Sequence, residues 1–339
     1  MISFSRSLLV AASLLLAAGA GHAQKAPMNV LIGNATANDT QAANNDKLAE
    51  LITSYSKGRL KASARHGESL GTNVQMFAAV QAGSLHGMIL PAGFASSIVP
   101  ELSVFDMPFL LPAVPDKMTA FAAQSKAATM LKDLAAKKGL HVLGFHGIGP
   151  QSFLTRFPIT KLEDISGKKF RVIPSPPRVG AYQDWSAVPR PMELGEVYTS
   201  LQQGTLDGME NPPDVIYKMK LHEAAKYYTI TEHFAFMSIM LVSKRWYDGL
   251  PKDLQEAVTR AGKDTIKFAD EGNMKTQASS LEALKKVAVV TNMPPAELQK
   301  MKDLARAGVW QRMKSDPVRG PLIKVLEEDV ARFTKTASK

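Results

Sequence analysis

Short apolar runs alternate with longer amphipathic stretches along most of this chain. The runs are typical of buried strands, and the stretches between them, about ten residues or longer, carry the spacing of amphipathic helices. Strands that alternate with helices predict an α/β protein with largely parallel sheets. The predicted strands lie at 29–33, 88–90, 142–145, 170–173, 236–242 and 287–290.

One helical stretch is much longer than the others. Residues 251–286 contain no proline after Pro251 and carry an apolar stripe that includes Leu254, Val258 and Ala261. A continuous helix of about 35 residues extends about 50 Å at 1.5 Å per residue, which exceeds the width of one ordinary domain. We therefore expect this helix to brace two domains. A second amphipathic helix is predicted after Pro317.

The first residues have the pattern of a secretory signal. A short segment with one positive charge at Arg6 precedes an apolar run over 7–20, and small residues at Gly21 and Ala23 follow it. The apolar run has about 14 residues, whereas a membrane anchor needs about 20. The sequence predicts cleavage near Ala23, so that 1–23 is a signal peptide and the mature chain is periplasmic.

Composition supports a two-domain secreted chain. Without the signal the chain has about 316 residues, more than one hydrophobic core usually holds. It has no cysteine, which excludes a disulfide framework, a thiolate zinc site and a cysteine nucleophile. The net charge is +10, but Lys and Arg alternate with Asp and Glu, so no nucleic-acid partner is expected.

Enzyme motifs are missing from the sequence. No two of the histidines that follow the signal have the i, i+4 spacing of a helical metal site, and neither a Gly-x-Ser-x-Gly motif nor a P-loop occurs. The segment from Gly147 to Gly149 begins like a dinucleotide fingerprint, but Ser152 stands where its third glycine belongs. We expect no cofactor, no metal and no catalysis.

A series of motifs in order along the chain resembles one family. The motifs match the DctP family, the periplasmic binding subunits of tripartite ATP-independent periplasmic (TRAP) transporters, and the resemblance covers essentially the whole mature chain. They are SLG at 69–71, FDMPFL at 105–110, GKKFRV at 167–172, GEVYTSLQ at 195–202, LDGMENP at 206–212, TEHF at 231–234 and LVSKRW at 241–246.

The resemblance implies a two-lobed periplasmic binding protein fold with the ligand in a cleft between the domains and a long bridging helix. The chain is expected to cross to the second domain near His146 and to return near Phe236. Domain I then comprises 24–145 with 237–268, domain II comprises 146–236 with 269–312, and a C-terminal helix occupies 313–339.

The resemblance also implies a carboxylate site. In the family an arginine at the position of Arg171 pairs with the ligand carboxylate, and a guanidinium offers a planar fork of donors that matches two carboxylate oxygens. Asn211 matches an asparagine that supports the same carboxylate. Asn34 follows the first strand and Ser175 follows the Arg171 strand, so both are candidate ligand contacts at strand ends.

Three positions differ from the sialic-acid-binding members of the family. Those members carry a second arginine where this chain has Gln151, a glutamate where it has Pro91 and an asparagine where it has Phe236. The loss of these polar groups argues against a sugar acid and favours a small monocarboxylate such as a 2-oxo or 2-hydroxy acid. Gln151 and His146 are candidates for binding a further ligand oxygen, and Phe236 is also expected to contact the ligand.

A dicarboxylate stays open, because Arg156 or Arg178 could supply a second cation. The expected function is to capture a small organic carboxylate and deliver it, as a monomer, to the small and large TRAP membrane subunits. The alternatives are a binding protein of an ABC transporter, a sensory binding protein, or an enzyme on a similar bilobal fold.

Overall fold

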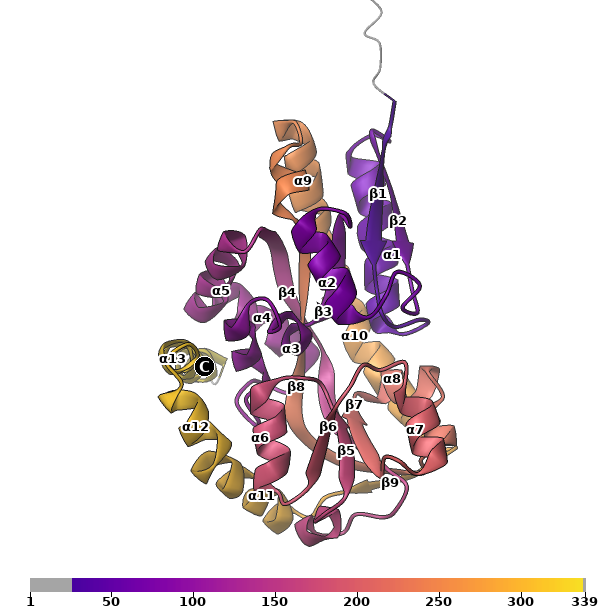
Figure 1. Cartoon of the computed structure of the whole chain (residues 1–339), viewed down its shortest axis with the longest axis vertical. Helices are drawn as coiled ribbons and strands as arrows, with labels where there is room; N and C mark the ends of the chain where they lie inside the picture. The colour runs from indigo at the N-terminus through magenta and orange to yellow at the C-terminus, as the bar shows by residue number, and fades with distance from the viewer. Residues whose placement is uncertain (1–25, 338–339) are drawn as a thin grey trace, which may run out of the picture.

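The structure, a computed structural model, describes residues 26–337. The predicted signal peptide at 1–23 lies outside the described residues. None of the helices within 26–337 is both long enough and apolar enough to cross a bilayer. The described chain forms two lobes, one above the other in Figure 1, that share a single mixed β-sheet.

The first lobe contains the N-terminal strands and the helices that cover them. β1 (Met28–Gly33) pairs in parallel with β2 (Leu60–Arg65) and β3 (Gly87–Pro91). Apolar side chains of β1 and α1, such as Ile32 and Leu48, are fully buried in one shared core. The helices of this lobe are α1 (Thr40–Tyr55), α2 (Asn73–Ala82), α3 (Ala92–Ala95), η1 (Pro100–Asp106), α4 (Pro115–Gln124) and α5 (Lys126–Lys137).

The second lobe has its own parallel strands and a separate core. β5 (Lys169–Val172) lies between β6 (Val188–Pro191) and β7 (Gly208–Asn211), parallel to both. Its core is aromatic, with Phe153 and Trp185 buried together. The helices of this lobe are η2 (Leu162–Ile165), α6 (Pro176–Asp184), α7 (Val197–Gln203), α8 (Pro213–Lys218), η3 (Leu221–Glu223), α11 (Pro295–Ala307) and α12 (Val309–Ser315).

Two long strands connect the lobes. β4 (Leu140–Thr155) and β8 (Tyr227–Ser243) run antiparallel from one lobe into the other, and the pairing of His146 with Ser238 lies near their middle. The register shifts between Gly147 and Gly149, where the ladder is irregular. The sheet order is β2-β1-β3-β8-β4-β7-β5-β6, and β9 (Val289–Asn292) pairs with β8.

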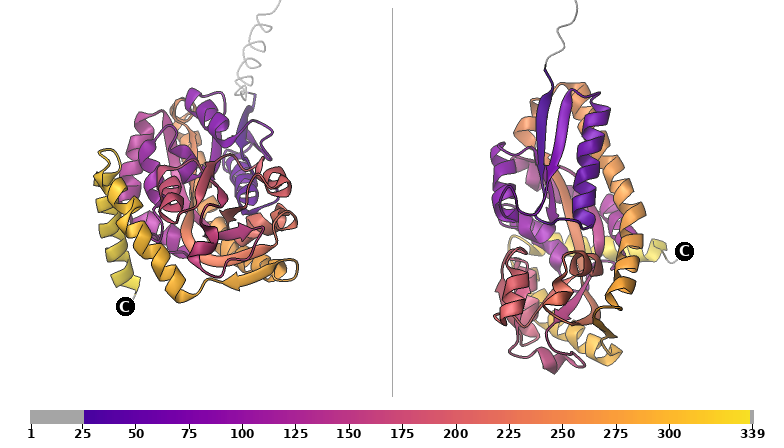
Figure 2. Two further views of the ribbon diagram at one scale, coloured as in Figure 1. Left: turned by 60° about the horizontal axis from the view of Figure 1, so that its bottom comes forward. Right: turned by 90° about the vertical axis from the view of Figure 1, so that its right-hand side faces the viewer.

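Helices also bridge the two lobes. After α9 (Lys244–Asp248), α10 (Lys252–Leu284) runs along both lobes, as the right-hand view of Figure 2 shows. It is fixed to the irregular part of β4, because Asn273 Nδ2 donates to the Gly147 carbonyl at 2.6 Å and Gln277 Nε2 donates to the Ile148 carbonyl at 3.2 Å. The final helix, α13 (Gly320–Ala337), returns from α12 of the second lobe to pack on α4 and α5 of the first.

The predicted fold class is confirmed, with one correction to the sheet. Every predicted strand and the bridging helix are present, but the sheet is mixed, since β8 is antiparallel to both β3 and β4. The pattern gave no sign of β2, β6 and β7, because these short strands have the polar or proline-containing sequences LKASAR, VPRP and GMEN. The exact domain boundaries at 146 and 236 stay a prediction.

Candidate functional site

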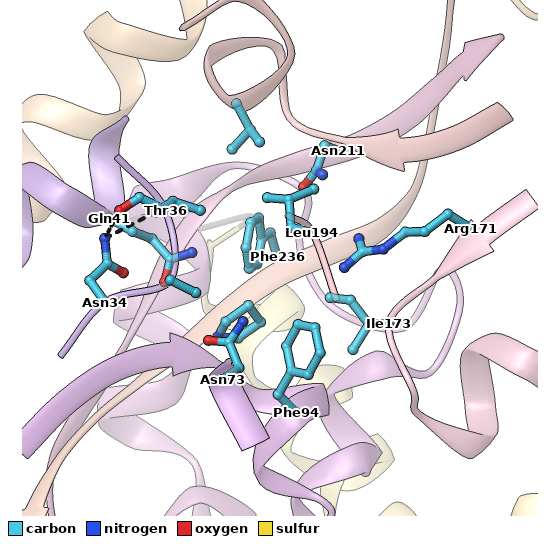
Figure 3. A pocket seen from close by; sticks show the side chains of 13 residues that line it. Asn34, Thr36, Gln41, Asn73, Phe94, Arg171, Ile173, Leu194, Asn211 and Phe236 are labelled. Carbon is cyan, nitrogen blue, oxygen red and sulfur yellow. Dashed lines mark hydrogen bonds between the residues drawn. The ribbon is translucent and has the colours of Figure 1, made fainter. Parts of the chain in front are cut away.

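A cavity lies between the two lobes. Figure 3 shows residues of the first lobe on one side and residues of the second lobe on the other, with Phe236 of β8 between them. Asn34, Arg171 and Asn211 lie at the carboxyl ends of parallel strands, where α/β proteins usually bind ligands. The lining residues are Asn34, Ala35, Thr36, Gln41, Asn73, Pro91, Phe94, Arg171, Ile173, Leu194, Asn211, Val215 and Phe236.

Arg171 is the only charged residue among those 13. It lies near the end of β5 and is 2% exposed, and its Nε donates to the Met192 carbonyl at 3.0 Å. This bond aims the rest of the guanidinium into the cavity (Figure 3), so its Nη groups face the space between the lobes. Burial lowers the pKa of Arg171, although Glu210 and Glu193 oppose the shift. A buried cation of this kind requires an anionic partner.

Asn211 adds a second donor on the same side of the cavity. It is the last residue of β7, which is parallel to β5, so the two strands end at the same edge. Its Nδ2 is buried and has no hydrogen-bond partner within 26–337, while its backbone carbonyl accepts from the Tyr228 hydroxyl at 3.1 Å. An unpaired buried amide donor beside a guanidinium provides the neutral half of a carboxylate site.

The opposite wall presents neutral amide groups. Asn34 follows β1, and its Nδ2 donates to the Thr36 carbonyl at 2.8 Å and to Thr36 Oγ1 at 3.1 Å. Asn73, at the start of α2, donates through Nδ2 to Glu193 at 3.1 Å. Asn34 therefore retains only its oxygen for a ligand, whereas Asn73 retains its oxygen and one N–H hydrogen. These oxygens complement a hydroxyl or N–H donor.

Apolar side chains form the rest of the wall. Phe94 lies under the Arg171 guanidinium, 5.9 Å from its carbon to the ring centroid, and Phe236 stands in the middle of the cavity wall. Ile173 and Leu194 of the second lobe complete the apolar part of the wall. The lining therefore combines one charged group and neutral polar groups with an apolar surface.

Four of the seven residues predicted to contact the ligand line this cavity: Asn34, Arg171, Asn211 and Phe236. The other three, Gln151, Ser175 and His146, are buried but are not among its lining residues. Asn73, Gln41 and Thr36 were missed by the sequence analysis, because isolated polar residues at helix starts and loops carry no distinctive spacing.

Each of the three residues outside the cavity has a buried setting of its own. Gln151 Oε1 accepts from Arg178 at 2.5 Å, and Ser175 precedes α6 with a buried hydroxyl that has no partner within 26–337. His146 lies inside β4 with Nε2 3.3 Å from Asn44 Nδ2. Burial lowers the pKa of His146 to about 4, so the ring is neutral at pH 7.

Arg178 belongs to a buried ion network behind the cavity. Its guanidinium bonds Asp106 of the first lobe at 2.8 Å and Glu210 of the second at 3.0 Å. The other oxygen of Glu210 accepts from the Tyr182 hydroxyl at 2.5 Å. Because Arg178 is ion-paired with these two carboxylates and is not among the residues that line the cavity, it does not provide a second cation there.

The fold and this site define a class of protein. Two lobes joined by crossing strands, with a buried cation and an unpaired amide donor facing the cavity between them, are the features of a two-lobed binding protein. Within 26–337 no cluster of three or more acidic or histidine side chains is arranged to hold a metal ion.

Comparison with known proteins identifies the family. A family model described as bacterial extracellular solute-binding protein, family 7 (DctP), matches residues 32–316. The chain therefore belongs to this family and is a solute-binding protein of the TRAP type.

Individual relatives agree with this assignment. The ectoine/5-hydroxyectoine-binding protein UehA of Ruegeria pomeroyi is 35% identical over 194 residues, and the alignment spans 57% of each chain. The ectoine-binding protein TeaA of Halomonas elongata is 31% identical, over 71% of this chain and 72% of its own. A solved TRAP binding protein from Desulfovibrio salexigens with bound orotic acid has a TM-score of 0.83 at 27% identity, over 90% of this chain and 99% of the other.

Proposed function

We propose that this protein captures one small monocarboxylic acid in the cavity between its lobes and delivers it to TRAP membrane subunits. The observation that carries the proposal is the single cation, Arg171, in a cavity whose other polar groups are all neutral. One guanidinium with an adjacent amide donor matches one carboxylate. A second carboxylate would be desolvated without a cationic partner, which disfavours a dicarboxylate.

The opposite wall narrows the ligand further. Because Asn34 and Asn73 present oxygens, the acid should carry a hydroxyl or N–H donor a few atoms from its carboxylate. A 2-hydroxy acid meets this requirement better than a 2-oxo acid. A ring that carries one carboxyl group and N–H donors meets it too, and ectoine and orotic acid, the compounds named for relatives, are of this kind.

The remaining expectations follow from the same proposal. The acid is bound and released unchanged, so the protein is not an enzyme. It works as a monomer in the periplasm after cleavage near Ala23. The lobes meet at 146 and 236, as the resemblance predicts, and Asn34, Arg171, Asn211 and Phe236 contact the ligand directly.

A thermal-shift screen of organic acids tests the ligand class. The panel contains 2-hydroxy and 2-oxo acids, pantoate, orotate, ectoine, succinate and galacturonate. An acid at about 100 times its Kd stabilises the folded chain by about 2.7 kcal/mol, or roughly 5 °C in Tm for a chain of this size. We expect a monocarboxylate with a donor group to give the largest shift. Stabilisation by succinate alone would contradict the single-carboxylate site.

Arg171→Ala tests the central residue. The variant should fold but lose the shift, because its cavity no longer contains a cation for the carboxylate. Arg190→Ala is a matched control, since Arg190 pairs with Arg171 in register on β6 but is exposed. Equal stabilisation of Arg171→Ala and the wild type by the best acid would overturn the assignment. Recovery of the acid chemically altered after incubation would favour the enzyme alternative.

A further inference from the structure

A carboxylate of the second lobe caps a helix of the first. Asp214, in the first turn of α8, accepts from the backbone N–H of Thr40 at 3.1 Å and from its hydroxyl at 2.5 Å through the same oxygen, Oδ2. Thr40 is the first residue of α1, and both residues are buried. The other oxygen of Asp214 accepts from Gln277 of α10 at 2.7 Å, which holds the carboxylate in place.

A second carboxylate repeats this arrangement on the neighbouring helix. Glu193 follows β6 in the second lobe, and its oxygens accept from Asn73 Nδ2 at 3.1 Å and from the Val74 backbone N–H at 3.3 Å. Asn73 and Val74 are the first two residues of α2 in the first lobe. The two caps involve different segments of the chain, but in both of them an acidic residue of the second lobe caps a helix of the first lobe.

Both contacts exist only while the lobes are together. The first N–H groups of a helix have no partner within the helix, and its N-terminus favours negative charge. Separation of the lobes would return these N–H groups and both carboxylates to water. Each cap therefore stabilises only the closed arrangement of the lobes.

The caps also adjoin the cavity. Asn73 lines it and is held by Glu193, while Leu194 and Val215, the residues directly after Glu193 and Asp214, line its opposite side. A ligand that fills the cavity and a closed pair of caps consequently require the same position of the lobes.

We propose that Asp214 and Glu193 are positioning residues for ligand capture, a two-part latch that holds the lobes closed and maintains a closed population even without ligand. The latch determines affinity by setting how much of the ligand's binding energy must be used to close the lobes. Its role in affinity rests on the proposed function of the cavity, but its effect on closure does not.

The latch can be measured without any ligand. The chain has no cysteine, so cysteines placed at the exposed positions Lys61 of β2 and Gln202 of α7 would carry a dye pair that reports the distance between the lobes. In single-molecule measurements on the ligand-free protein, the wild type should show a closed population. Asp214→Asn and Glu193→Gln should each lower the closed-to-open ratio about fivefold, as expected for a weakened cap, and the double variant about 25-fold.

Asp329→Asn is the matched control. Asp329 Oδ2 accepts from the Ser125 hydroxyl at 2.7 Å and from the Ala127 N–H at 3.0 Å, so it caps α5 with the same chemistry as Asp214, but α13 and α5 both belong to the first-lobe side. The closed-to-open ratio of this variant should equal that of the wild type.

Amide hydrogen exchange separates a latch from two local contacts. In a latch, Asp214→Asn should reduce protection of the Val74 amide, and Glu193→Gln should reduce protection of the Thr40 amide, although neither residue contacts the amide that it affects. The proposal is overturned if each substitution changes only its own partner's amide, or if the ligand-free wild type shows no closed population. Neither result depends on an acid, so failure of the latch is distinguishable from failure of the carboxylate site.

Discussion

At the scale of single residues, Asp39 makes stability depend on pH. Asp39 caps α1, where its Oδ1 accepts from the Ala42 N–H at 2.9 Å, while its Oδ2 is buried with no partner within 26–337. Burial, together with the nearby carboxylate of Asp214, raises the pKa of Asp39 to about 7. The folded chain therefore holds a proton between about pH 4 and pH 7 that the unfolded chain releases.

The sign of the effect follows from linkage. Where the folded state binds more protons, the free energy of unfolding falls as pH rises, so the Asp39 contribution is present below about pH 4 and lost by about pH 7. Asp39→Asn imitates the protonated acid. We expect its stability relative to the wild type to increase by about 2–4 kcal/mol from pH 4 to pH 8, measured by urea unfolding. His146 contributes a pH dependence of opposite sign, but it is present in both proteins and cancels in the comparison. A stability difference between Asp39→Asn and the wild type that stays constant from pH 4 to pH 8 would contradict the assignment.

Individual residues also show what the sequence could predict about the site. Arg171, Asn211 and Asn34 are found in the cavity because they lie at the ends of strands that the fold brings together, and Phe236 is found there because the crossing strand β8 passes between the lobes. Gln151 was predicted as a ligand contact because it stands where sialic-acid-binding members carry a second arginine, and in the structure its oxygen accepts from Arg178, which is 27 residues away in the sequence. No local pattern specifies which polar groups pair with one another across separate elements.

At the scale of elements, replacing either of two glycines of α10 by alanine should change the stability of the chain in opposite directions. A Cβ at Gly272 would meet no atom within 4 Å, whereas a Cβ at Gly262 would come within 2.8 Å of Leu143 Cβ. Glycine inside a helix costs up to about 1 kcal/mol relative to alanine. Gly272→Ala should therefore stabilise the chain by about 0.5–1 kcal/mol.

Gly262→Ala is the paired test, and it should destabilise the chain by about 1–3 kcal/mol, because β4 and α10 must move apart to accept the methyl group. Urea unfolding of both variants measures the difference. Equal effects would mean that α10 does not pack on β4 as closely as the structure shows.

The elements also differ in how far the sequence predicted them. The 33 residues of α10 carry a long, proline-free stripe, and they form the helix that the pattern indicates. β7 has only four residues, GMEN, and all of them are buried although Glu210 and Asn211 are polar. Their burial is compensated by Arg178, Tyr182 and the ligand cavity, which are contributions of the tertiary structure that no window of sequence contains.

At the scale of the whole molecule, the two lobes should unfold together. β4 and β8 continue through both lobes in one sheet, α10 packs along both, and the buried Arg178 network joins Asp106 of the first lobe to Glu210 of the second. Unfolding of either lobe alone would leave the shared strands half-paired. It would also leave the buried Arg178 without one of its carboxylates, and breaking a buried ion pair costs about 3–5 kcal/mol.

The chain's three tryptophans allow this cooperativity to be measured. Trp185 is buried in the second lobe and Trp246 lies on α9 of the first, so two variants that each keep one of them, with phenylalanine at the other two positions, report the lobes separately. Each variant is unfolded in urea and followed by both tryptophan fluorescence and circular dichroism. In both variants, we expect the fluorescence transition to have the same midpoint and slope as the circular dichroism transition of that variant. Midpoints that differ while the circular dichroism curve shows two steps would mean that the lobes fold independently, and that the crossing strands act as a hinge without binding the lobes into one cooperative unit.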